Sequence, residues 1–396
     1  MMFENISPLT ADPILGLMAE FRNDKREKKI DLGVGVYRDD HGNTPIMRAV
    51  KEAEKQKLTI ESTKSYIGPN GSERYNELIQ NMTLGSNHVV IKDRRIATIQ
   101  TPGGCGALKI GAELIKKVKG NSTVWVSSPT WANHIPLLGG AGLKINDYHY
   151  YCPVTKRINK SKMFETLEKA SDGDIILVHG CCHNPSGVDL DEEDWKNLTE
   201  LLARKNLLPF IDLAYQGLGD GLEEDVTGIR KLLSIIPEAL VACSYSKNFG
   251  LYRERTGGLH VILSSADITN AVSGQLGSIA RGIYSMPPAH GAFLVEQILD
   301  DGCLKSIWTG ELNEMRGRIS NLRMKLATEL SEATNLDFNF IMNQKGMFSF
   351  LGISKEQIDI LKNKHAIYMV DSSRINVAGL NSNNLDFFVQ GVKAVV

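Results

Sequence analysis

The sequence lacks the features that mark membrane-spanning, secreted and zinc-binding proteins. No apolar run reaches the roughly 20 residues that a membrane-spanning helix needs. The first residues place no basic segment before an apolar one, so no secretory signal is expected. The six cysteines have no spacing typical of structural zinc, and only Cys181 and Cys182 are adjacent. We therefore expect reduced thiols, no metal site and a cytoplasmic protein.

An excess of charge is also absent. The formal net charge is −1, so nothing in the overall charge favours nucleic acid or an anionic membrane as a partner. The 396 residues are 42% hydrophobic and 23% charged, as in ordinary globular proteins. This length has room for about two or three domains.

Short apolar and β-branched runs recur at the spacing of an α/β protein. Helical patterns between several of them, such as 191–205, imply crossover connections and a mostly parallel sheet. After about Pro287 the pattern becomes helical, with a long charged helix over 308–330 and a smaller α+β portion at the end. The predicted strands are 96–100, 124–127, 175–179, 208–212, 241–244 and 260–263.

The first third of the chain has further local signals. Asp12 and Pro13 are typical of the start of a helix, here a short one. An amphipathic helix is predicted over 45–58 and a loop over 66–71. The glycine-punctuated segment 32–37 is either an edge strand with a bulge or backbone that approaches a ligand closely.

One lysine follows a predicted strand among residues suited to anions. The apolar run 240–243 leads into Ser244, and Lys247 and Arg255 follow in one polar loop. Strand ends are where ligands bind in open α/β sheets. Lys247 is thus a candidate nucleophile that forms a Schiff base with a cofactor aldehyde, with Ser244 and Arg255 holding an anion beside it. A surface lysine in a polar loop is the alternative.

A glycine-rich turn gives a second anion-binding pattern. The strand 96–100 leads into Thr101-Pro-Gly-Gly-Cys105-Gly-Ala107, and a helical pattern follows over 108–119. Glycines let the backbone come close to a phosphate, and a helix N-terminus supplies free N–H groups. Such turns are common, and this one is neither a dinucleotide-binding fingerprint nor a Walker loop.

A carboxylate and a tyrosine close the strand 208–212. Asp212 and Tyr215 are candidates to hold opposite edges of one pyridine ring, with Asp212 keeping the ring nitrogen protonated and Tyr215 bonding the phenolic oxygen. The alternative is a helix-capping aspartate and a packed tyrosine. Asn184 lies in an Asn-Pro-Ser-Gly turn, which is an ordinary turn signal. Cys181 and His183 are expected to pack.

The stretch Ser244-Tyr-Ser-Lys247-Asn-Phe-Gly, with Arg255 and Gly257 beyond it, resembles the lysine signature of class I pyridoxal-phosphate (PLP) aminotransferases. The similarity to the aspartate and aromatic amino-acid branch is close and runs nearly end to end. It departs at Thr256, where that signature is usually apolar, and at Cys105, where the family usually has threonine or serine. Backbone donors survive the second change, but a thiol is a poor donor to phosphate.

The resemblance implies a fold-type-I α/β enzyme that binds pyridoxal 5'-phosphate and forms a homodimer with shared active sites. A large PLP-binding domain over 46–310 is implied, with a small domain built from 1–45 and 311–396. Implied catalytic residues are Lys247, Asp212 and Tyr215. Implied cofactor-binding residues are these three with Gly104, Cys105, Trp131, His134, Asn184, Ser244, Arg255 and, from the neighbouring subunit, Tyr66.

Substrate contacts are also implied by the resemblance, at Gly35, Trp131, Asn184, Arg281 and Arg374. Arg374 corresponds to the arginine that pairs with the substrate α-carboxylate, and Arg281 to the one that crosses the dimer interface to a side-chain carboxylate. Taken alone, either arginine is equally typical of a solvated surface charge, and Trp131 and His134 of core packing. Met286 stands where relatives often carry a small polar residue.

These residues in family order predict an aminotransferase that moves amino groups from aspartate, tyrosine or phenylalanine to 2-oxoglutarate by a ping-pong mechanism. A strictly aspartate-specific or strictly aromatic enzyme is the alternative for the substrate. Other classes are a PLP lyase or decarboxylase, a nucleotide-binding protein that uses the glycine loop, and a non-catalytic regulator. The regulator needs an added DNA-binding domain, and the enzyme-like pattern begins at the N-terminus of this sequence.

Overall fold

The computed structural model describes residues 3–4, 6–7 and 13–396. The chain folds into two compact units. The first comprises Met1–Asn43, Asn321–Met342 and Met347–Val396, and the second Thr44–Ser320 and Asn343–Gly346. Because helix α12 (Gly302–Thr334) spans residue 320, it contributes to both units.

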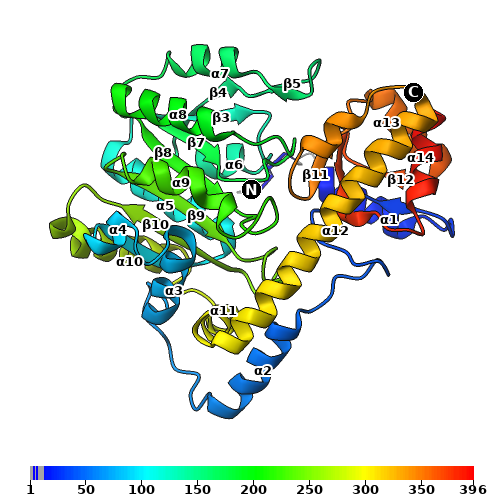
Figure 1. Ribbon diagram of the computed structural model, residues 1–396. Helices are drawn as coiled ribbons and strands as arrows, with labels where there is room; N and C mark the ends of the chain where they lie inside the picture. The colour runs from blue at the N-terminus through cyan, green and yellow to red at the C-terminus, as the bar shows by residue number, and fades with distance from the viewer. Residues whose placement is uncertain (1–2, 5, 8–12) are drawn as a thin grey trace. The chain divides into compact units, whose positions relative to one another are not determined.

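The second unit is built on a seven-stranded sheet in the order β2-β10-β9-β8-β7-β3-β4 (Figure 1). Its strands are β2 (Ile96–Pro102), β3 (Thr123–Ser128), β4 (Lys144–His149), β7 (Ile175–His179), β8 (Leu208–Leu213), β9 (Ala239–Ser244) and β10 (Thr256–Ile262). All pairs in this sheet are parallel except those of β10, which runs antiparallel to both β9 and β2. The predicted mostly parallel α/β sheet is therefore confirmed.

The antiparallel direction of β10 has a simple cause. Two consecutive strands can pair in parallel only if a crossover connection, usually a helix, returns the chain to the end of the sheet where the first strand began. The segment between Ser244 and Thr256, described throughout, contains no helix, so the chain turns around and returns beside β9. The predicted strand 260–263 covers only the second half of β10. The loop that precedes β10 carries Lys247.

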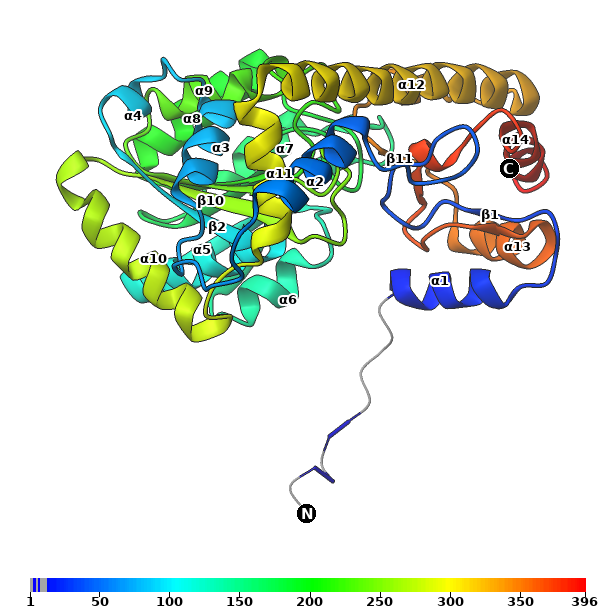
Figure 2. The ribbon, with the colours of Figure 1, turned by 90° about the horizontal axis from the view of Figure 1, so that it is seen from below.

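Helices cover both faces of this sheet, which is why central strands such as β7 and β9 are buried along their whole length, whereas the edge strand β4 is mostly exposed. Figure 2 shows α5 (Gly103–Lys119) and α10 (Thr269–Ile283) on one side, and α3 (Glu73–Leu84) and α8 (Glu192–Lys205) on the other. Phe210, Leu240 and Leu259 pack under α5 in one buried cluster. The other helices of four or more residues in this unit are α2 (Arg48–Ile60), α4 (Val89–Lys92), α6 (His134–Gly139), α7 (Lys160–Leu167), α9 (Thr227–Leu233) and α11 (Ala289–Asp300), and a hairpin joins β5 (Tyr151–Cys152) to β6 (Arg157–Ile158).

The first unit combines segments from both parts of the chain. Strand β1 (Ile30–Asp31) pairs in parallel with β12 (Ile367–Tyr368), and β11 (Phe348–Phe350) pairs antiparallel with β13 (Arg374–Asn376). Leu326, Leu361 and Phe388 belong to its buried cluster. They lie on α12, α13 (Lys355–His365) and α14 (Leu385–Lys393).

Several sequence predictions can be compared directly with these elements. The predicted helices over 45–58, 191–205 and 308–330 are confirmed as α2, α8 and α12, with shifted ends. Asp191 caps α8, and its side chain accepts a hydrogen bond from the Asp194 N–H. The predicted first helix corresponds to α1 (Pro13–Asn23), whereas its capping residue Asp12 lies outside the described residues.

The edge-strand interpretation of 32–37 is wrong. Strand β1 ends at Asp31, and residues 32–37, which the structure describes, form no strand. The side chain of Asp31 accepts the N–H of Gly33 at 3.0 Å, which turns the backbone out of the extended course. Within the described part of the chain, no helix is long and apolar enough to cross a membrane.

Packing between α5 and the sheet predicts opposite effects for two glycine substitutions. A Cβ at Gly111 would lie 2.5 Å from Phe210 Cζ and 3.1 Å from Leu240 Cδ2. Overpacking of this kind costs about 1–3 kcal/mol, more than the roughly 0.5–1 kcal/mol that alanine gains over glycine within a helix. Gly111→Ala should therefore lower the free energy of unfolding measured with denaturant.

Gly317→Ala is the matched control. Gly317 lies exposed on α12, and a Cβ there meets nothing within 4 Å. This substitution should raise the free energy of unfolding by about 0.5–1 kcal/mol. Equal shifts for the two variants would contradict the packing described for α5.

Candidate active site

Functional side chains gather where four strands of the large sheet end. Strands β2, β7, β8 and β9 run in the same direction, so their carboxyl ends share one edge. His179 lies opposite Asp212 in the register of β7 and β8. Gly257 of β10 lies opposite Ser244, the last residue of β9. This edge is where ligands bind in open α/β folds.

Lys247 lies just beyond β9 and is partly buried. Its Nζ atom lies 4.7 Å from the centre of the Tyr215 ring. Burial lowers the pKa of Lys247 below its ordinary value, although the nearby Asp212 carboxylate opposes this effect. A lower pKa increases the fraction of free amine, which is the form that attacks an aldehyde.

Asp212 is a buried carboxylate held by a histidine. His134, the first residue of α6, lies with Nε2 at 3.0 Å from Asp212 Oδ2. Burial favours protonation of Asp212, but the hydrogen bond from His134 and the charge of Lys247 outweigh it, so its pKa is lowered. The carboxylate therefore stays ionised in a site that excludes water, where it can hold a proton on a ring nitrogen.

A hydrogen-bond chain extends behind Asp212. Because a carboxylate only accepts, His134 Nε2 donates to it, and in a neutral ring Nδ1 then accepts from the hydroxyl of Thr130 at 2.8 Å. His179 Nε2 lies 3.3 Å from the same hydroxyl oxygen and completes the series as a donor. Burial lowers the pKa of His179 to about 3, so His179 is neutral at physiological pH. Each member fixes the orientation of the next.

Trp131, Asn184 and Tyr215 surround the same region. The Trp131 ring lies edge-on to His134, with 5.3 Å between ring centres. Asn184 and Tyr215 are both buried, and Asn184 Nδ2 lies 3.5 Å from the Tyr215 hydroxyl oxygen. An amide and a phenol that meet in this way present two polar groups to one ligand atom.

An anion cradle lies at the start of α5. A Cβ at Gly103 would lie 2.4 Å from the guanidinium of Arg255, and one at Gly104 would lie 3.0 Å from the Cβ of Ser244. Glycine at both positions thus brings the amide groups of the first turn close to a hydroxyl and a guanidinium. Arg255, which has a φ of 52°, also donates to Ser246 Oγ at 3.4 Å.

Cys105 completes the first turn of α5 and is partly buried. The amide of Asn133 lies 3.8 Å from its sulfur. Burial raises the pKa of the Cys105 thiol, so this thiol is neutral at physiological pH. It adds no charge that would repel an anion in the cradle.

These residues fit pyridoxal phosphate. The cradle would supply amide, hydroxyl and guanidinium donors for a phosphate group, and Lys247 would supply an amine for the aldehyde. Asp212 supplies a buried negative charge for the pyridine nitrogen. The phosphate space is one that a side chain at Gly103 or Gly104 would fill.

The other unit holds the predicted contacts Gly35 and Arg374. Arg374 is buried at the start of β13, and its guanidinium donates to the Gly33 carbonyl at 2.6 Å. The guanidinium carbon lies 4.4 Å from the centre of the Phe348 ring. A Cβ at Gly35 would lie 2.8 Å from Phe348 Cζ, so the three residues pack as one group. The planar guanidinium is thereby held in one orientation.

Tyr66, Arg281 and Met286 take no part in the contacts described above. Tyr66 is 92% exposed in the loop after α2, and Arg281 is exposed in the last turn of α10. Among the described residues, no carboxylate forms an ion pair with Arg281. Met286 is partly buried just after α10.

Sequence reasoning missed three members of this site. Ser246 lies two residues after Ser244 and contacts Arg255, and the repeated serine was the available signal. Thr130 and His179 extend the chain behind Asp212. No local pattern marks them, because their contact depends on strands β3 and β7 lying side by side.

Comparisons with known proteins agree with this geometry. Residues 27–392 match the family model described as aminotransferase class I and II. The chain is 45% identical to aspartate aminotransferase of Haemophilus influenzae, over 100% of both chains. It is 42% identical to aromatic-amino-acid aminotransferase of Pseudomonas aeruginosa, over 99% of this chain and 98% of the relative.

A solved structure has the same fold. The fold superposes on an aromatic-amino-acid aminotransferase from Burkholderia pseudomallei, covalently bound to pyridoxal phosphate, with a TM-score of 0.98, 38% identity and coverage of 100% and 99% of the two chains. With a lysine, a buried aspartate and an anion cradle at one sheet edge, and full-length relatives of one kind, this chain belongs to the family of class I and II aminotransferases.

Proposed function

We propose that this chain exchanges amino groups between amino acids and 2-oxo acids, with aspartate and aromatic amino acids as donors and 2-oxoglutarate as acceptor. The observation that carries this is the grouping of Lys247, the ionised Asp212 and the glycine cradle at one sheet edge. The names of the relatives divide between aspartate and aromatic substrates at similar identity, which supports a dual range. A panel of amino donors with 2-oxoglutarate tests it.

The chemistry of the transfer depends on a few proton positions. When bound, pyridoxal phosphate supplies an electron sink and a carbon that accepts the amino group. Lys247 Nζ would take the proton from the substrate Cα and deliver it to the cofactor carbon that accepts the amino group. Asp212 holds a proton on the ring nitrogen, and His134 and Thr130 keep its carboxylate oriented. Tyr215 and Asn184 bond the ring oxygen.

Cradle residues fix the cofactor phosphate in this proposal. The N–H groups around Gly104 and Cys105, the Ser244 hydroxyl and the Arg255 guanidinium are its donors. Trp131 covers one face of the ring. Held by its phosphate, the cofactor would present its aldehyde carbon to the amine of Lys247.

Substrate carboxylates are assigned to two arginines. We assign the α-carboxylate to Arg374, with Asn184 and the Gly35 backbone, because its buried guanidinium is already oriented by Gly33 and Phe348. A second, side-chain carboxylate is assigned to Arg281, which is exposed and has the bidentate shape that a carboxylate needs. Met286 adapts to varied shapes and so suits an apolar wall for an aromatic side chain.

A homodimer with shared active sites is also part of this proposal. The end of α2 and the loop after it expose Leu58, Ile60 and Tyr66, at 86%, 56% and 92%. Apolar side chains that cluster on one exposed segment are typical of an interface. Tyr66 then reaches the cofactor phosphate of the partner, and Arg281 its substrate.

We place the enzyme in the cytoplasm. All six cysteines are unbridged, in keeping with a reducing compartment. The substrates we propose are metabolites of that compartment, and no nucleic-acid or membrane partner is proposed.

Replacing Lys247 tests the central residue. Lys247→Ala should lose the visible absorption of the bound cofactor, because no amine remains to link to it, and kcat should fall by about 10²–10⁴-fold or more. Lys109→Ala is the matched control, since this lysine lies one turn beyond the cradle and pairs with Glu113 at 2.7 Å. Near-parent turnover by Lys247→Ala, without added amine, would overturn the assignment.

Mixing Lys247→Ala, which is expected to be inactive, with Arg281→Ala, which is expected to be impaired toward aspartate, tests the shared site. Arg281→Ala and Lys247→Ala subunits, mixed with subunit exchange, should recover about one quarter of the parent activity toward aspartate. Each hybrid dimer has one site in which both residues are intact, because the two residues of a site come from different subunits. Exchange proved by mass spectrometry without any recovery would contradict a shared site.

Arg281→Ala also tests the dual substrate range. A charge-assisted pair in a partly dry site contributes about 1.5–3 kcal/mol, so kcat/KM for aspartate should fall by about ten- to a hundred-fold. The value for phenylalanine should change little, because its side chain has no charge to pair. Equal losses of kcat/KM for aspartate and phenylalanine would contradict the role of Arg281. A parent enzyme inactive with phenylalanine and tyrosine would contradict the dual substrate range.

A further inference from the structure

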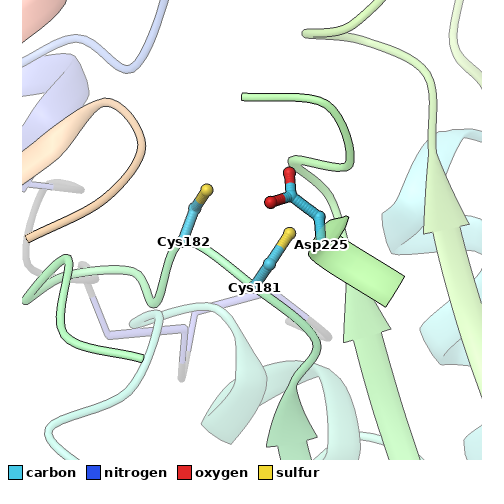
Figure 3. A group of neighbouring side chains, drawn as sticks. All are labelled: Cys181, Cys182 and Asp225. Atoms are coloured by element: carbon cyan, nitrogen blue, oxygen red, sulfur yellow. The ribbon is translucent and has the colours of Figure 1, made fainter. Parts of the chain in front are cut away.

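Away from Lys247, two thiols and a carboxylate converge in the interior of the second unit. Cys181 and Cys182 follow β7, and Asp225 lies in the short helix η1 (Glu224–Val226). Their two sulfur atoms and one Asp225 oxygen lie within 4.8 Å of one another. Figure 3 shows the three side chains facing the same small space. Among the described residues, no other three His, Cys, Asp or Glu side chains bring their donor atoms together in this way.

The backbone at Cys182 brings the two thiols together. Adjacent side chains in an extended chain point to opposite sides, but Cys182 has a φ of 51°, in the left-handed region. The partly buried carboxylate of Asp189 accepts the N–H groups of Cys182 at 2.7 Å and His183 at 2.8 Å and so holds this turn. A conformation that is uncommon for a non-glycine residue is thus maintained by surrounding contacts.

Backbone N–H groups also fix the carboxylate of Asp225. Its Oδ2 accepts the N–H groups of Gly217 at 2.8 Å and Gly219 at 3.0 Å. Its Oδ1 accepts those of Asp220 at 2.7 Å and Gly221 at 3.3 Å. The bond from Gly221 is the longest of the four, so an ion at Oδ1 would displace that bond first.

We propose that Cys181, Cys182 and Asp225 bind one soft divalent cation of the zinc group, Zn²⁺ or Cd²⁺. Thiolates select such ions, and a tetrahedral zinc has sulfur at about 2.3 Å and carboxylate oxygen at about 2.0–2.2 Å. Ligand atoms around it lie about 3.5–3.8 Å apart, so inward movements of about 1 Å close the site. The fourth position stays open to water.

The charge balance favours a divalent ion. Binding releases one proton from each thiol and adds two positive charges, so the net charge of the buried cluster is unchanged. The hydrogen bond with Cys182 and burial raise the pKa of the Cys181 thiol well above its ordinary value. Because each thiol must lose its proton to bind the ion, the affinity for metal rises with pH.

A bound ion would join two loops of the proposed active site. Cys181 and Cys182 lead directly to Asn184, and Asp225 holds the segment 217–221 that follows Tyr215. An ion that binds only the folded chain stabilises it in proportion to the logarithm of the ion concentration. The site thus stabilises the loops beside the Asn184 and Tyr215 pair.

The test uses reduced holoenzyme in which the partly exposed Cys152 and the exposed Cys303 are changed to serine. Cys105, which is also partly exposed, is kept because it belongs to the anion cradle. After incubation with cadmium chloride and dialysis, one Cd²⁺ per chain should remain, with a sulfur-to-cadmium charge-transfer band in the ultraviolet. The band should strengthen from mildly acidic to mildly alkaline pH, and X-ray absorption should find two sulfur neighbours. Zinc chloride should raise the melting temperature of the same protein.

Further substitutions in this background separate the ligands. Cys181→Ser with Cys182→Ser should lose the band and the retained ion, whereas Asp225→Asn should keep the band and weaken binding by at least about ten-fold. No retained cadmium in the background protein, or fewer than two sulfur neighbours, overturns the proposal even if the double variant does not fold. So does an unchanged band in a folded double variant.

Discussion

An ionised carboxylate kept away from water is the constraint around which the large unit is arranged. Asp212 gains its charge from the His134 hydrogen bond and from Lys247, against the cost of burial. That balance holds only while β8 positions Asp212 beside the first residue of α6, and while Thr130 and His179 orient the imidazole. Because parallel strands end at the same edge, the sheet places the groups that keep Asp212 ionised next to one another.

The anion cradle depends on a second constraint, the close approach of the α5 backbone to neighbouring side chains. Glycine at 103 and 104 leaves no room for a side chain, so the backbone of α5 meets Arg255 and Ser244 directly. Positive charge from Arg255 lies at one end of the site, and the negative charge of Asp212 lies farther along the same edge. A ligand with a phosphate at one end and a basic nitrogen at the other matches this polarity.

Local pattern in the sequence is enough to predict most of this. Apolar runs with polar residues after them place the strand ends near Asp212, Asn184 and Ser244, and their shared edge follows from parallel pairing. The resemblance to a family supplies the roles. What pattern cannot predict depends on tertiary contact: the Thr130 and His179 links, the antiparallel course of β10, and the turn after Asp31, where an edge strand was one of two alternatives. For Cys181 the sequence predicts only packing, because its meeting with Cys182 and Asp225 depends on a left-handed residue and a loop far along the chain.

The position of β10 bears on the order in which the protein can assemble as it is synthesised. In the described sheet, β2 pairs with β10 alone, although strands β3 to β9 all lie between these two strands in the sequence. Until Ile262 has left the ribosome, β2 has no strand to join, and the growing chain carries a sheet with its edge at β9 open. The segment that closes this gap begins directly after the loop of Lys247. Lys247 therefore leaves the ribosome shortly before the strand that joins β2 to β9, and the loop that carries it can take its final position only when β10 has closed the sheet.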